Sequence, residues 1–443
     1  MSARPPLPGG PYLVLGLARS GVAAALALHA RGEQVVGVDA GAPDVGRLAD
    51  AGVEVHLDDP GVQLLDRVAT VVKSPGVPHT AAVVEAARAR GLAVVGELEL
   101  AWRLLPNDFI AVTGTNGKTT TTEWIGHVHR EAGLPVAVAG NVGTAAASLV
   151  GSLDPAATVI CETSSFQLED TTAFAPDAAV LLNIEPDHLD RHGTFEAYVD
   201  AKRGAFKRQP PEAVAVISAD ELHEMGGAAR RVRFGFAPDE GLDVTHRHPW
   251  IRWGRKRLVR VDELGVPGIH NVENALATAA VTLARGIDPE AVRAGLRTFA
   301  GVPHRLEPIR ELDGVRYVND SKATNVSSTS VALRTMRLRG APVHVVLGGR
   351  TKAQDFAPLA EDVAATCASV HLIGEGAGEI AAALADTGVP LQEDGDMERA
   401  VHAARAAAQP GEVVLLSPAC ASFDQYADFE ARGEHFRALV EAL

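Results

Sequence analysis

The chain has 443 residues, 47% of them hydrophobic and 22% charged, and its net charge is −15. This composition is typical of a globular protein of two to four domains, and the negative charge disfavours nucleic acid or an anionic membrane as a partner. No apolar run reaches the roughly 18 residues that a membrane-spanning helix needs, and the first residues lack a signal-peptide pattern. The three cysteines form no paired motif, so we expect a cytoplasmic protein without membrane insertion.

The first part of the chain alternates strand and helix patterns. Residues 12–16 and 33–39 are rich in Val and Leu and predict strands, and the Ala-rich residues 21–32 predict the helix between them. A third strand with a turn is predicted over residues 68–78. This order favours a parallel sheet with helical crossovers.

Two loops of this part could bind a ligand. The sequence GLARSG (16–21) follows the first strand, and Asp39 ends the second. In a dinucleotide-binding fold such a loop binds a pyrophosphate and the acid binds a ribose hydroxyl. Ala18 replaces the middle glycine of the usual pattern, so a dehydrogenase and a site for another nucleotide diphosphate both remain open. The sequence KSPGVP (73–78) fits a plain turn as well as a ligand loop.

The clearest motif is IAVTGTNGKTT (110–120), in which an apolar strand enters a Gly-rich turn and Lys118 and Thr119 open a helix. Backbone N–H groups at a helix start, together with a lysine, bind phosphates, and the hydroxyl after the lysine suits Mg²⁺. The strict pattern has a glycine where this chain has Val112, so the motif is a shortened variant. It predicts a phosphate loop rather than a stray Gly-rich turn.

Polar clusters follow two strands of the same block. Glu162 ends the strand predicted within 157–165, and Asp187, His188, Asp190 and His192 follow the strand predicted within 177–190. Because the carboxyl ends of parallel strands form the ligand crevice, we expect these side chains near the phosphates and their Mg²⁺. Residues 244–261 predict a hairpin, and residues 270–286 predict the helix that closes the block.

A third alternation of strands and Ala-rich helices begins near residue 302, with strands predicted over 343–349, 369–376 and 411–419. Polar loops follow these strands and should meet at one edge of a third sheet. That edge would carry Arg305, Asp320, Lys322, Lys352 and Ser422. Such an edge suits a phosphate and a carboxylate-bearing substrate.

The order of the motifs resembles that of the Mur ligases. These motifs are GTNGKTT, ETSSFQLE, NIEPDHLDRH, HNVENALA, HRLE, NDSKATN and LSPACASFDQ…FEARGEHF, and the resemblance spans nearly the whole chain. The last motif is most similar to that of the family members that add D-glutamate. The resemblance implies an α/β protein of three domains: a Rossmann-like domain for a UDP sugar (1–97), a central P-loop ATPase domain (98–302) and a Rossmann-like domain for the incoming amino acid (303–443).

The resemblance also implies an activity. ATP would phosphorylate the carboxylate of UDP-N-acetylmuramoyl-L-alanine, and the amine of D-glutamate would attack the resulting acyl phosphate, in peptidoglycan synthesis and hence in cell shape and division. Two Mg²⁺ ions, a carbamylated Lys202 and a monomer are expected. The alternatives are a sister Mur ligase, a folylpolyglutamate synthase-like ligase, and a nucleotide-binding protein that is not an enzyme.

Motif positions in the resemblance assign residues to five roles. The expected catalytic residues are Lys118, Glu162, His188, Lys202 and Lys322. The residues expected to bind ATP are Gly114, Thr115, Asn116, Gly117, Lys118, Thr119, Thr120, Asn271, Asn274, Arg305 and Asp320. The expected Mg²⁺ ligands are Thr119, Glu162, His188 and Lys202. The residues expected to bind the UDP sugar are Gly16, Leu17, Ala18, Asp39, Ser74, Gly76 and Asn141. Those expected to bind glutamate are His188, Thr324, Lys352, Ser422 and Phe429. Arg350 stands where the family often has an acid, and it either supplies a further donor or faces solvent.

Overall fold

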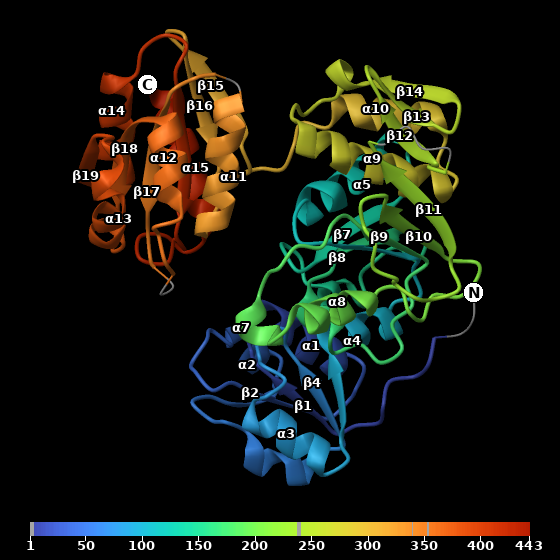
Figure 1. Ribbon diagram of the computed structural model, residues 1–443. Helices are drawn as coiled ribbons and strands as arrows, with labels where there is room; N and C mark the ends of the chain where they lie inside the picture. Colours follow the sequence, from blue (N-terminus) through green and yellow to red (C-terminus); the bar gives the residue numbers. More distant parts are fainter. Residues whose placement is uncertain (1–3, 237–240, 339, 352–353) are drawn as a thin grey trace. The chain divides into compact units, whose positions relative to one another are not determined.

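The computed structural model describes residues 4–236, 241–338, 340–351 and 354–443 (Figure 1). They form three sheets accompanied by helices, which confirms the predicted α/β class. The chain divides into two compact units, Met1–Ala300 and Gly301–Leu443. Among the described residues, no helix combines the length and the apolar character needed to cross a membrane.

The first sheet has five parallel strands in the order β3-β2-β1-β4-β5. The strands are β1 (Tyr12–Leu15), β2 (Val35–Val38), β3 (Glu54–His56), β4 (Thr70–Lys73) and β5 (Ala93–Gly96). Its helices are α1 (Arg19–His29), α2 (Gly46–Asp50), η1 (Val62–Arg67) and α3 (Ala82–Ala89). Leu15 pairs in register with both Val38 and Lys73, so the loops after β1, β2 and β4 leave the same edge of the sheet.

The second sheet has nine strands in the order β14-β13-β12-β11-β10-β9-β6-β8-β7. The strands are β6 (Phe109–Thr113), β7 (Val136–Gly140), β8 (Thr158–Glu162), β9 (Ala178–Leu181), β10 (Val214–Ser218), β11 (Arg230–Gly235), β12 (Val244–Arg247), β13 (Trp250–Trp253) and β14 (Lys256–Arg260). The helices are α4 (Glu97–Leu104), α5 (Lys118–Glu131), η2 (Ala146–Leu149), α6 (Ser165–Leu168), α7 (Leu189–His192), α8 (Phe195–Arg203), η3 (Val261–Glu263), α9 (Ile269–Ala284) and α10 (Pro289–Thr298).

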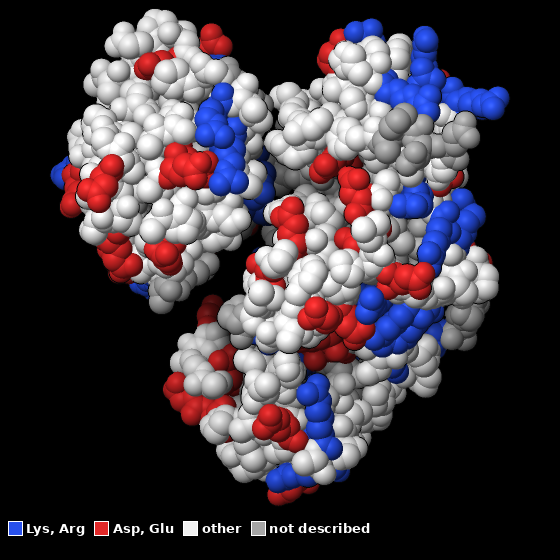
Figure 2. All heavy atoms as spheres, in the orientation of Figure 1, with Lys and Arg blue, Asp and Glu red and all other residues white. Residues whose placement is uncertain are grey.

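The segment predicted as a hairpin, residues 244–261, forms the three antiparallel strands β12, β13 and β14 at one end of this sheet. The strands from β7 to β12 are parallel, so the antiparallel part is confined to that end. Figure 2 shows Lys and Arg side chains gathered over this end, where Arg255, Lys256 and Arg257 are exposed.

The two sheets of the first unit share one hydrophobic core. Tyr12 and Val14 of β1 belong to the same buried cluster as Phe109 of β6 and Val159 of β8. Helices α1 and α4 also pack against η2, which follows β7. Because burial of apolar side chains is the main favourable term in folding, this shared core stabilises the two sheets as one body.

The third sheet has six strands in the order β15-β16-β20-β17-β18-β19, and only the β15–β16 pair is antiparallel. The strands are β15 (Glu307–Leu312), β16 (Val315–Asn319), β17 (Val343–Gly348), β18 (Cys367–Ile373), β19 (Leu391–Gly395) and β20 (Val413–Ala419). The helices are α11 (Val326–Leu338), α12 (Leu359–Thr366), α13 (Ala377–Leu384), η4 (Ala385–Thr387), α14 (Met397–Ala407) and α15 (Phe429–Ala442). Val345 and Val346 belong to different buried clusters, as alternation along a strand requires when both faces are covered.

Candidate nucleotide and substrate sites

The predicted phosphate loop connects β6 to α5. Gly117 ends the loop with a φ of 82°, and a Cβ at this position would lie 2.4 Å from Oδ1 of Asn274, so only glycine fits. The backbone N–H groups of Thr115 and Asn116 donate to Oδ1 of Asn183, at 3.1 and 2.8 Å. The loop therefore has a fixed shape before the first turn of α5.

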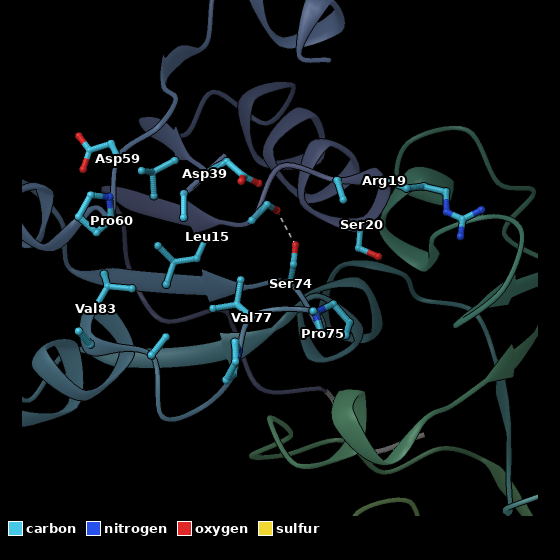
Figure 3. A pocket seen from close by; sticks show the side chains of 18 of the residues that line it. Leu15, Arg19, Ser20, Asp39, Asp59, Pro60, Ser74, Pro75, Val77 and Val83 are labelled. Carbon is cyan, nitrogen blue, oxygen red and sulfur yellow. Dashed lines mark hydrogen bonds between the residues drawn. The ribbon is translucent and has the colours of Figure 1, made fainter. Parts of the chain in front are cut away.

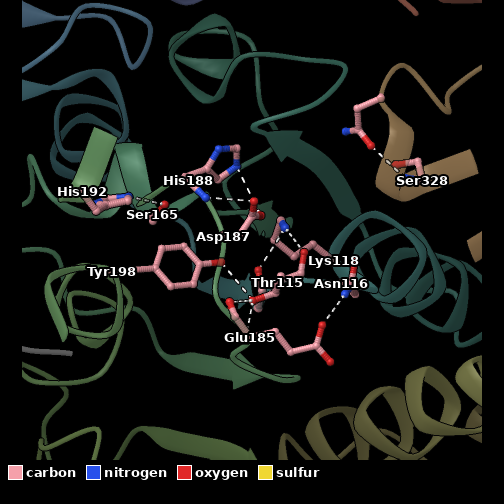
Figure 4. Close-up of polar contacts among 12 residues, drawn as sticks. Thr115, Asn116, Lys118, Ser165, Glu185, Asp187, His188, His192, Tyr198 and Ser328 are labelled. Atoms are coloured by element: carbon pink, nitrogen blue, oxygen red, sulfur yellow. Dashed lines mark hydrogen bonds and ion pairs between the residues drawn. The ribbon is translucent and has the colours of Figure 1, made fainter. Parts of the chain in front are cut away.

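Lys118 lies across this loop (Figure 4). Its Nζ donates to the carbonyl oxygens of Gly114 and Thr115, at 3.0 and 2.9 Å. Its ammonium is thus close to the N-terminal end of α5, where helix N–H groups favour an anion.

Asn271 and Asn274, which are predicted to bind ATP, lie against the same loop and helix. Oδ1 of Asn274 accepts from Oγ1 of Thr121 at 3.2 Å, and its Nδ2 donates to Oδ1 of Asn271 at 3.3 Å. The structure thus brings together the residues of the first unit that the sequence predicts for ATP. They are Gly114, Thr115, Asn116, Gly117, Lys118, Thr119, Thr120, Asn271 and Asn274.

Glu162 lies on the strand beside β6, and Lys202 contacts the phosphate loop. Glu162 ends β8, the strand beside β6, and is only 3% exposed; its Oε1 accepts from Nδ2 of Asn141 at 3.1 Å. Lys202 of α8 is 1% exposed, and its Nζ donates to the carbonyl of Gly114 at 2.8 Å. Glu162 is therefore buried at the end of the strand next to β6, and Lys202 contacts the loop itself.

The environment of Lys202 disfavours its charged form. Burial lowers the pKa of its amine well below the ordinary value, and the nearby ammonium of Lys118 lowers it further. Nζ also lies 4.4 Å from the centre of the Tyr198 ring, whose hydroxyl hydrogen-bonds to Oγ1 of Thr115 at 3.0 Å (Figure 4). The amine is thus directed at the loop by a packed shell rather than exposed to water.

His188 directly precedes α7 and has a left-handed backbone, φ 52°; its imidazole is about half exposed. Nε2 lies 3.4 Å from Oδ2 of Asp187, and the ring packs on Phe166 with 4.8 Å between centroids. Within the described residues, no three His, Cys, Asp or Glu side chains converge closely enough to hold a metal ion. A metal here would therefore need ligands besides these side chains.

A pocket of about 600 Å³ opens at the edge of the first sheet (Figure 3). The predicted residues that line it are Gly16, Ala18, Asp39, Ser74, Gly76 and Asn141. Asp39 accepts at Oδ2 from the N–H of Leu17 at 2.6 Å, so the predicted Leu17 contributes through its backbone. Oγ of Ser74 donates to the carbonyl of Gly16 at 2.6 Å, which joins the loops after β1 and β4. The two loops that the sequence analysis proposed as ligand-binding, GLARSG and KSPGVP, therefore line a pocket.

In the second unit, Asp320 and Lys322 follow β16. Asp320 is 1% exposed, and its carboxylate accepts from the N–H of Leu306 and from Oγ of Ser417, at 3.1 and 2.8 Å. Burial raises the pKa of Asp320 to about 6, although the charge of Arg305 opposes this shift. Lys322 places its Nζ 5.3 Å from the centre of the Phe429 ring. Arg305, Asp320, Lys322 and Phe429 are thus neighbours in the second unit.

The other predicted glutamate residues lie on nearby loops of this unit. The N–H of Thr324 donates to the carbonyl of Lys322 at 2.9 Å, and Ser422, which follows β20, is 2% exposed. Arg350 and Ala421 form a backbone bridge, so the loops after β17 and β20 lie side by side. The Arg350 side chain is exposed and pairs with Glu375 at 3.3 Å, and Lys352 lies outside the described residues.

Three residues at these sites were not predicted. Asn183 and Tyr198 hold the phosphate loop, as described above, and Arg432 of α15 donates to the carbonyls of Ser321 and Cys420, at 2.9 and 3.1 Å. Asn183 stands directly after an apolar strand, which is a signal that could have identified it. Arg432 is 1% exposed within an ordinary helical pattern, so nothing local marks it.

The fold and the loop define a P-loop α/β protein. Residues 112–282 match the Mur ligase middle domain, and residues 304–420 match the Mur ligase, glutamate ligase domain. A UDP-N-acetylmuramoylalanine–D-glutamate ligase of Pelotomaculum thermopropionicum is 43% identical over 97% of both chains, and one of Acidobacterium capsulatum is 39% identical over 98% of this chain and 97% of its own. The chain belongs to the Mur ligase family.

Solved structures agree in fold. The UDP-N-acetylmuramate-alanine ligase MurC of Thermotoga maritima matches with a TM-score of 0.63 and 19% identity over 98% of this chain and 99% of its own. MurF ligase of the same organism, in complex with ADP, matches with a TM-score of 0.60 and 18% identity over 98% of this chain and 96% of its own. At this identity the likeness concerns the fold alone.

Proposed function

We propose that the chain is an ATP-dependent ligase that joins D-glutamate to UDP-N-acetylmuramoyl-L-alanine in peptidoglycan precursor synthesis. The observation that carries this proposal is the 43% identity, over 97% of both chains, to a relative named for that ligation. The phosphate loop and the 600 Å³ pocket support it, because the reaction needs one site for a triphosphate and another for a sugar nucleotide.

The proposed reaction overcomes the poor electrophilicity of a carboxylate. The alanyl carboxylate attacks the γ-phosphorus of ATP, which gives an acyl phosphate and ADP. The uncharged amine of D-glutamate then attacks the acyl carbon. The tetrahedral intermediate expels inorganic phosphate and loses a proton to leave the amide. Each step depends on positioning and on stabilisation of negative charge.

In this proposal the first unit binds ATP and the sugar nucleotide. Lys118 and the N–H groups at the start of α5 stabilise the β- and γ-phosphates, and Asn271 and Asn274 bind the adenine end. The pocket with Asp39 and Ser74 takes the UDP moiety.

The residues present fit Mg²⁺. Thr119 offers a hydroxyl at the start of α5, and the buried carboxylate of Glu162 accepts from Asn141; hard oxygen donors of this kind are those that Mg²⁺ prefers. We propose that Thr119 and Glu162 hold one ion and that His188 and a carbamylated Lys202 hold a second. When bound, the ions neutralise phosphate charge. Phosphate oxygens and water complete such sites in many nucleotide enzymes, which agrees with the lack of a ready three-residue cluster among the described residues.

Carbamylation of Lys202 is supported by its surroundings. Its amine is 1% exposed and its pKa is strongly lowered, so the neutral form that adds carbon dioxide is favoured. The product is an anion with two oxygen donors, which removes the repulsion between Lys202 and Lys118.

We propose that the second unit supplies the amino-acid site. Thr324 and Ser422 lie on loops, and Phe429 is the first residue of α15. We propose that they bind glutamate together with Lys352 and with His188 of the first unit. Arg305, Asp320 and Lys322 would act on the nucleotide and the transferring phosphate. The proposed domains are 1–97, 98–302 and 303–443. None of Cys161, Cys367 and Cys420 is in a disulfide, which supports a cytoplasmic location. We also propose that the protein is a monomer.

The experiment that tests this function measures phosphate release from ATP with UDP-N-acetylmuramoyl-L-alanine and a panel of amino acids. Release should require D-glutamate, and L-glutamate should be a poor substrate. Release with another amino acid in its place would identify a sister ligase. No release with any amino acid, despite bound ATP, would point to a nucleotide-binding protein instead.

A further inference from the structure

The loop from Ser74 to Pro78 contributes five consecutive residues to the 600 Å³ pocket. Two cations hold its backbone. Arg191 of α7 donates from Nη1 to the carbonyl of Pro75 at 2.8 Å and from Nη2 to that of Val77 at 3.4 Å. Lys73 donates from Nζ to the same Val77 carbonyl at 2.6 Å. The shape of this wall of the pocket therefore depends on side chains that lie outside its lining.

Each of these cations also pairs with an acid directly after α6. Arg191 lies 2.8 Å from Oε1 of Glu169, and Lys73 lies 2.7 Å from Oδ2 of Asp170. The Lys73–Asp170 pair is buried, with side chains 0% and 2% exposed, whereas Arg191 and Glu169 are 15% and 14% exposed. Removing one partner of a buried pair strongly destabilises a fold, so Arg191 is the cation whose loss the fold better tolerates.

The same short helix contacts the turn that begins with His188. Phe166 of α6 packs against His188, its ring lies 3.9 Å from the Arg191 guanidinium carbon, and it stacks on His192 at 5.3 Å. His192 also hydrogen-bonds to Oγ of Ser165 at 2.9 Å (Figure 4). Gln167 of α6 lines the pocket itself. Helix α6 and Arg191 thus connect the pocket wall to the His188 turn.

We infer that Arg191 is a positioning residue that holds the Ser74–Pro78 wall in the shape needed to bind a uridine diphosphate sugar. It also fixes the position of that wall relative to the His188 turn. This inference rests on the proposed function. A planar guanidinium can bind two carbonyls and a carboxylate at once, and a lysine ammonium cannot reproduce that fork. Shifts of about 1 Å in a substrate-holding loop cost up to 100-fold in rate, so the wall's position matters even though Arg191 touches no substrate.

The test compares Arg191→Met and Arg191→Lys with a matched control, Arg103→Met. Arg103 lies in the same unit, donates to Glu99 at 2.7 Å and to the carbonyl of Pro6 at 2.5 Å, and is 9% exposed, but it does not line the pocket or contact the Ser74–Pro78 wall. Arg191→Met should raise the KM for the sugar nucleotide at least about tenfold and change the KM for ATP less than about twofold, the effect that loss of one charge-assisted contact predicts. Arg191→Lys should raise the KM for the sugar nucleotide, but by less than Arg191→Met does. Arg103→Met should lower thermal stability and leave every KM within about twofold.

Titration with UDP alone, by calorimetry, separates this inference from the proposed function. If the wild-type chain binds UDP but makes no product, the proposed function fails, and a UDP affinity at least about tenfold weaker in Arg191→Met still supports the inference. If the wild-type chain binds no UDP, both the proposed function and the inference about Arg191 fail. An Arg191→Lys variant with wild-type UDP affinity, or equal rises of all KM values, would reduce Arg191 to a structural contact and overturn the inference.

Discussion

Lys118 is the cation that the proposed phosphoryl transfer needs most directly. Its Nζ donates to the carbonyls of Gly114 and Thr115. Replacing Lys118 by alanine removes these two hydrogen bonds, and we expect β6 and α5 to keep their fold. Loss of one charge-stabilising group of this kind costs about 3–4 kcal/mol or more. We expect Lys118→Ala to reduce phosphate release at least about 100-fold. Thermal unfolding should stay near that of the wild type, and activity within threefold of wild type would remove Lys118 from the mechanism.

Lys202 allows a chemical rescue. If its carbamate supplies the oxygen donors, Lys202→Ala should be nearly inactive, because a small apolar side chain provides neither charge nor ligand. Added acetate or propionate should restore part of the activity, since a short carboxylate fits the space left by the side chain. Lys202→Arg is the control, because it fills that space with a permanent cation and should show no rescue. Equal responses of the two variants to carboxylates would contradict carbamylation.

Among individual site residues, the sequence predicted those that a short local motif identifies. Gly114, Gly117 and Lys118 belong to one short motif, so their spacing predicted a phosphate site. The pocket residues near Gly16 were predicted from a similar local pattern. The positions of Asn183 and Lys202 depend on long-range packing: Asn183 lies 67 residues from Asn116, and Lys202 lies 88 residues from Gly114. Lys202 was assigned by the family resemblance, and Asn183 was not found.

Many of the predicted strands have a strong burial pattern. The strands β1, β2, β4, β8, β9 and β20 are almost entirely buried and rich in Val, Leu, Ile or Ala, as is typical of a parallel sheet covered on both faces. By contrast, β3 has three residues with partial exposure, and β5 is an edge strand that is only partly buried. Short, partly exposed edge strands carry little periodic signal, so both were missed.

Helix α4 provides a prediction about pH. Glu97, its first residue, is 1% exposed, and only its Oε1 is satisfied, by the N–H of Ala147 at 2.7 Å. Burial raises the pKa of Glu97 to about 7 from 4.5. Between these values the folded state binds more protons than the unfolded state, so the free energy of unfolding falls as pH rises from 4.5 through 7.

Glu97→Gln should remove this part of the pH dependence, because the amide stays neutral. The contribution is about 3 kcal/mol at most, since each unit of pKa displacement corresponds to about 1.4 kcal/mol. Urea unfolding at pH 4.5 and pH 8 measures it, with Glu85→Gln, an exposed acid on α3, as the control that should keep the wild-type slope. A Glu97→Gln variant whose stability falls as steeply as that of the wild type would mean that Glu97 is charged in the folded state.

At the scale of the whole molecule, the proposed roles are divided between the two compact units. The residues proposed for ATP phosphates, Lys118 and Glu162, belong to the first unit, and Ser422 and Phe429, proposed for glutamate, belong to the second. The sequence predicted three alternating α/β blocks from the order of their strands. Packing decides how such blocks combine: the first two sheets share one hydrophobic core, and the third has buried clusters of its own.

The division predicts that substrates bring the two units together. The acyl phosphate would form on the first unit, and its attacking amine would be held by the second, so the reaction needs an arrangement in which both sets of residues reach one carbon atom. Closure of domains around substrates is a common way to assemble such a site. We expect the radius of gyration to fall when a non-hydrolysable ATP analogue and UDP-N-acetylmuramoyl-L-alanine are added together. Small-angle scattering measures the change, and Lys118→Ala serves as the control because weakened nucleotide binding should reduce it. Identical scattering profiles with and without both ligands, under conditions in which calorimetry shows them bound, would contradict closure.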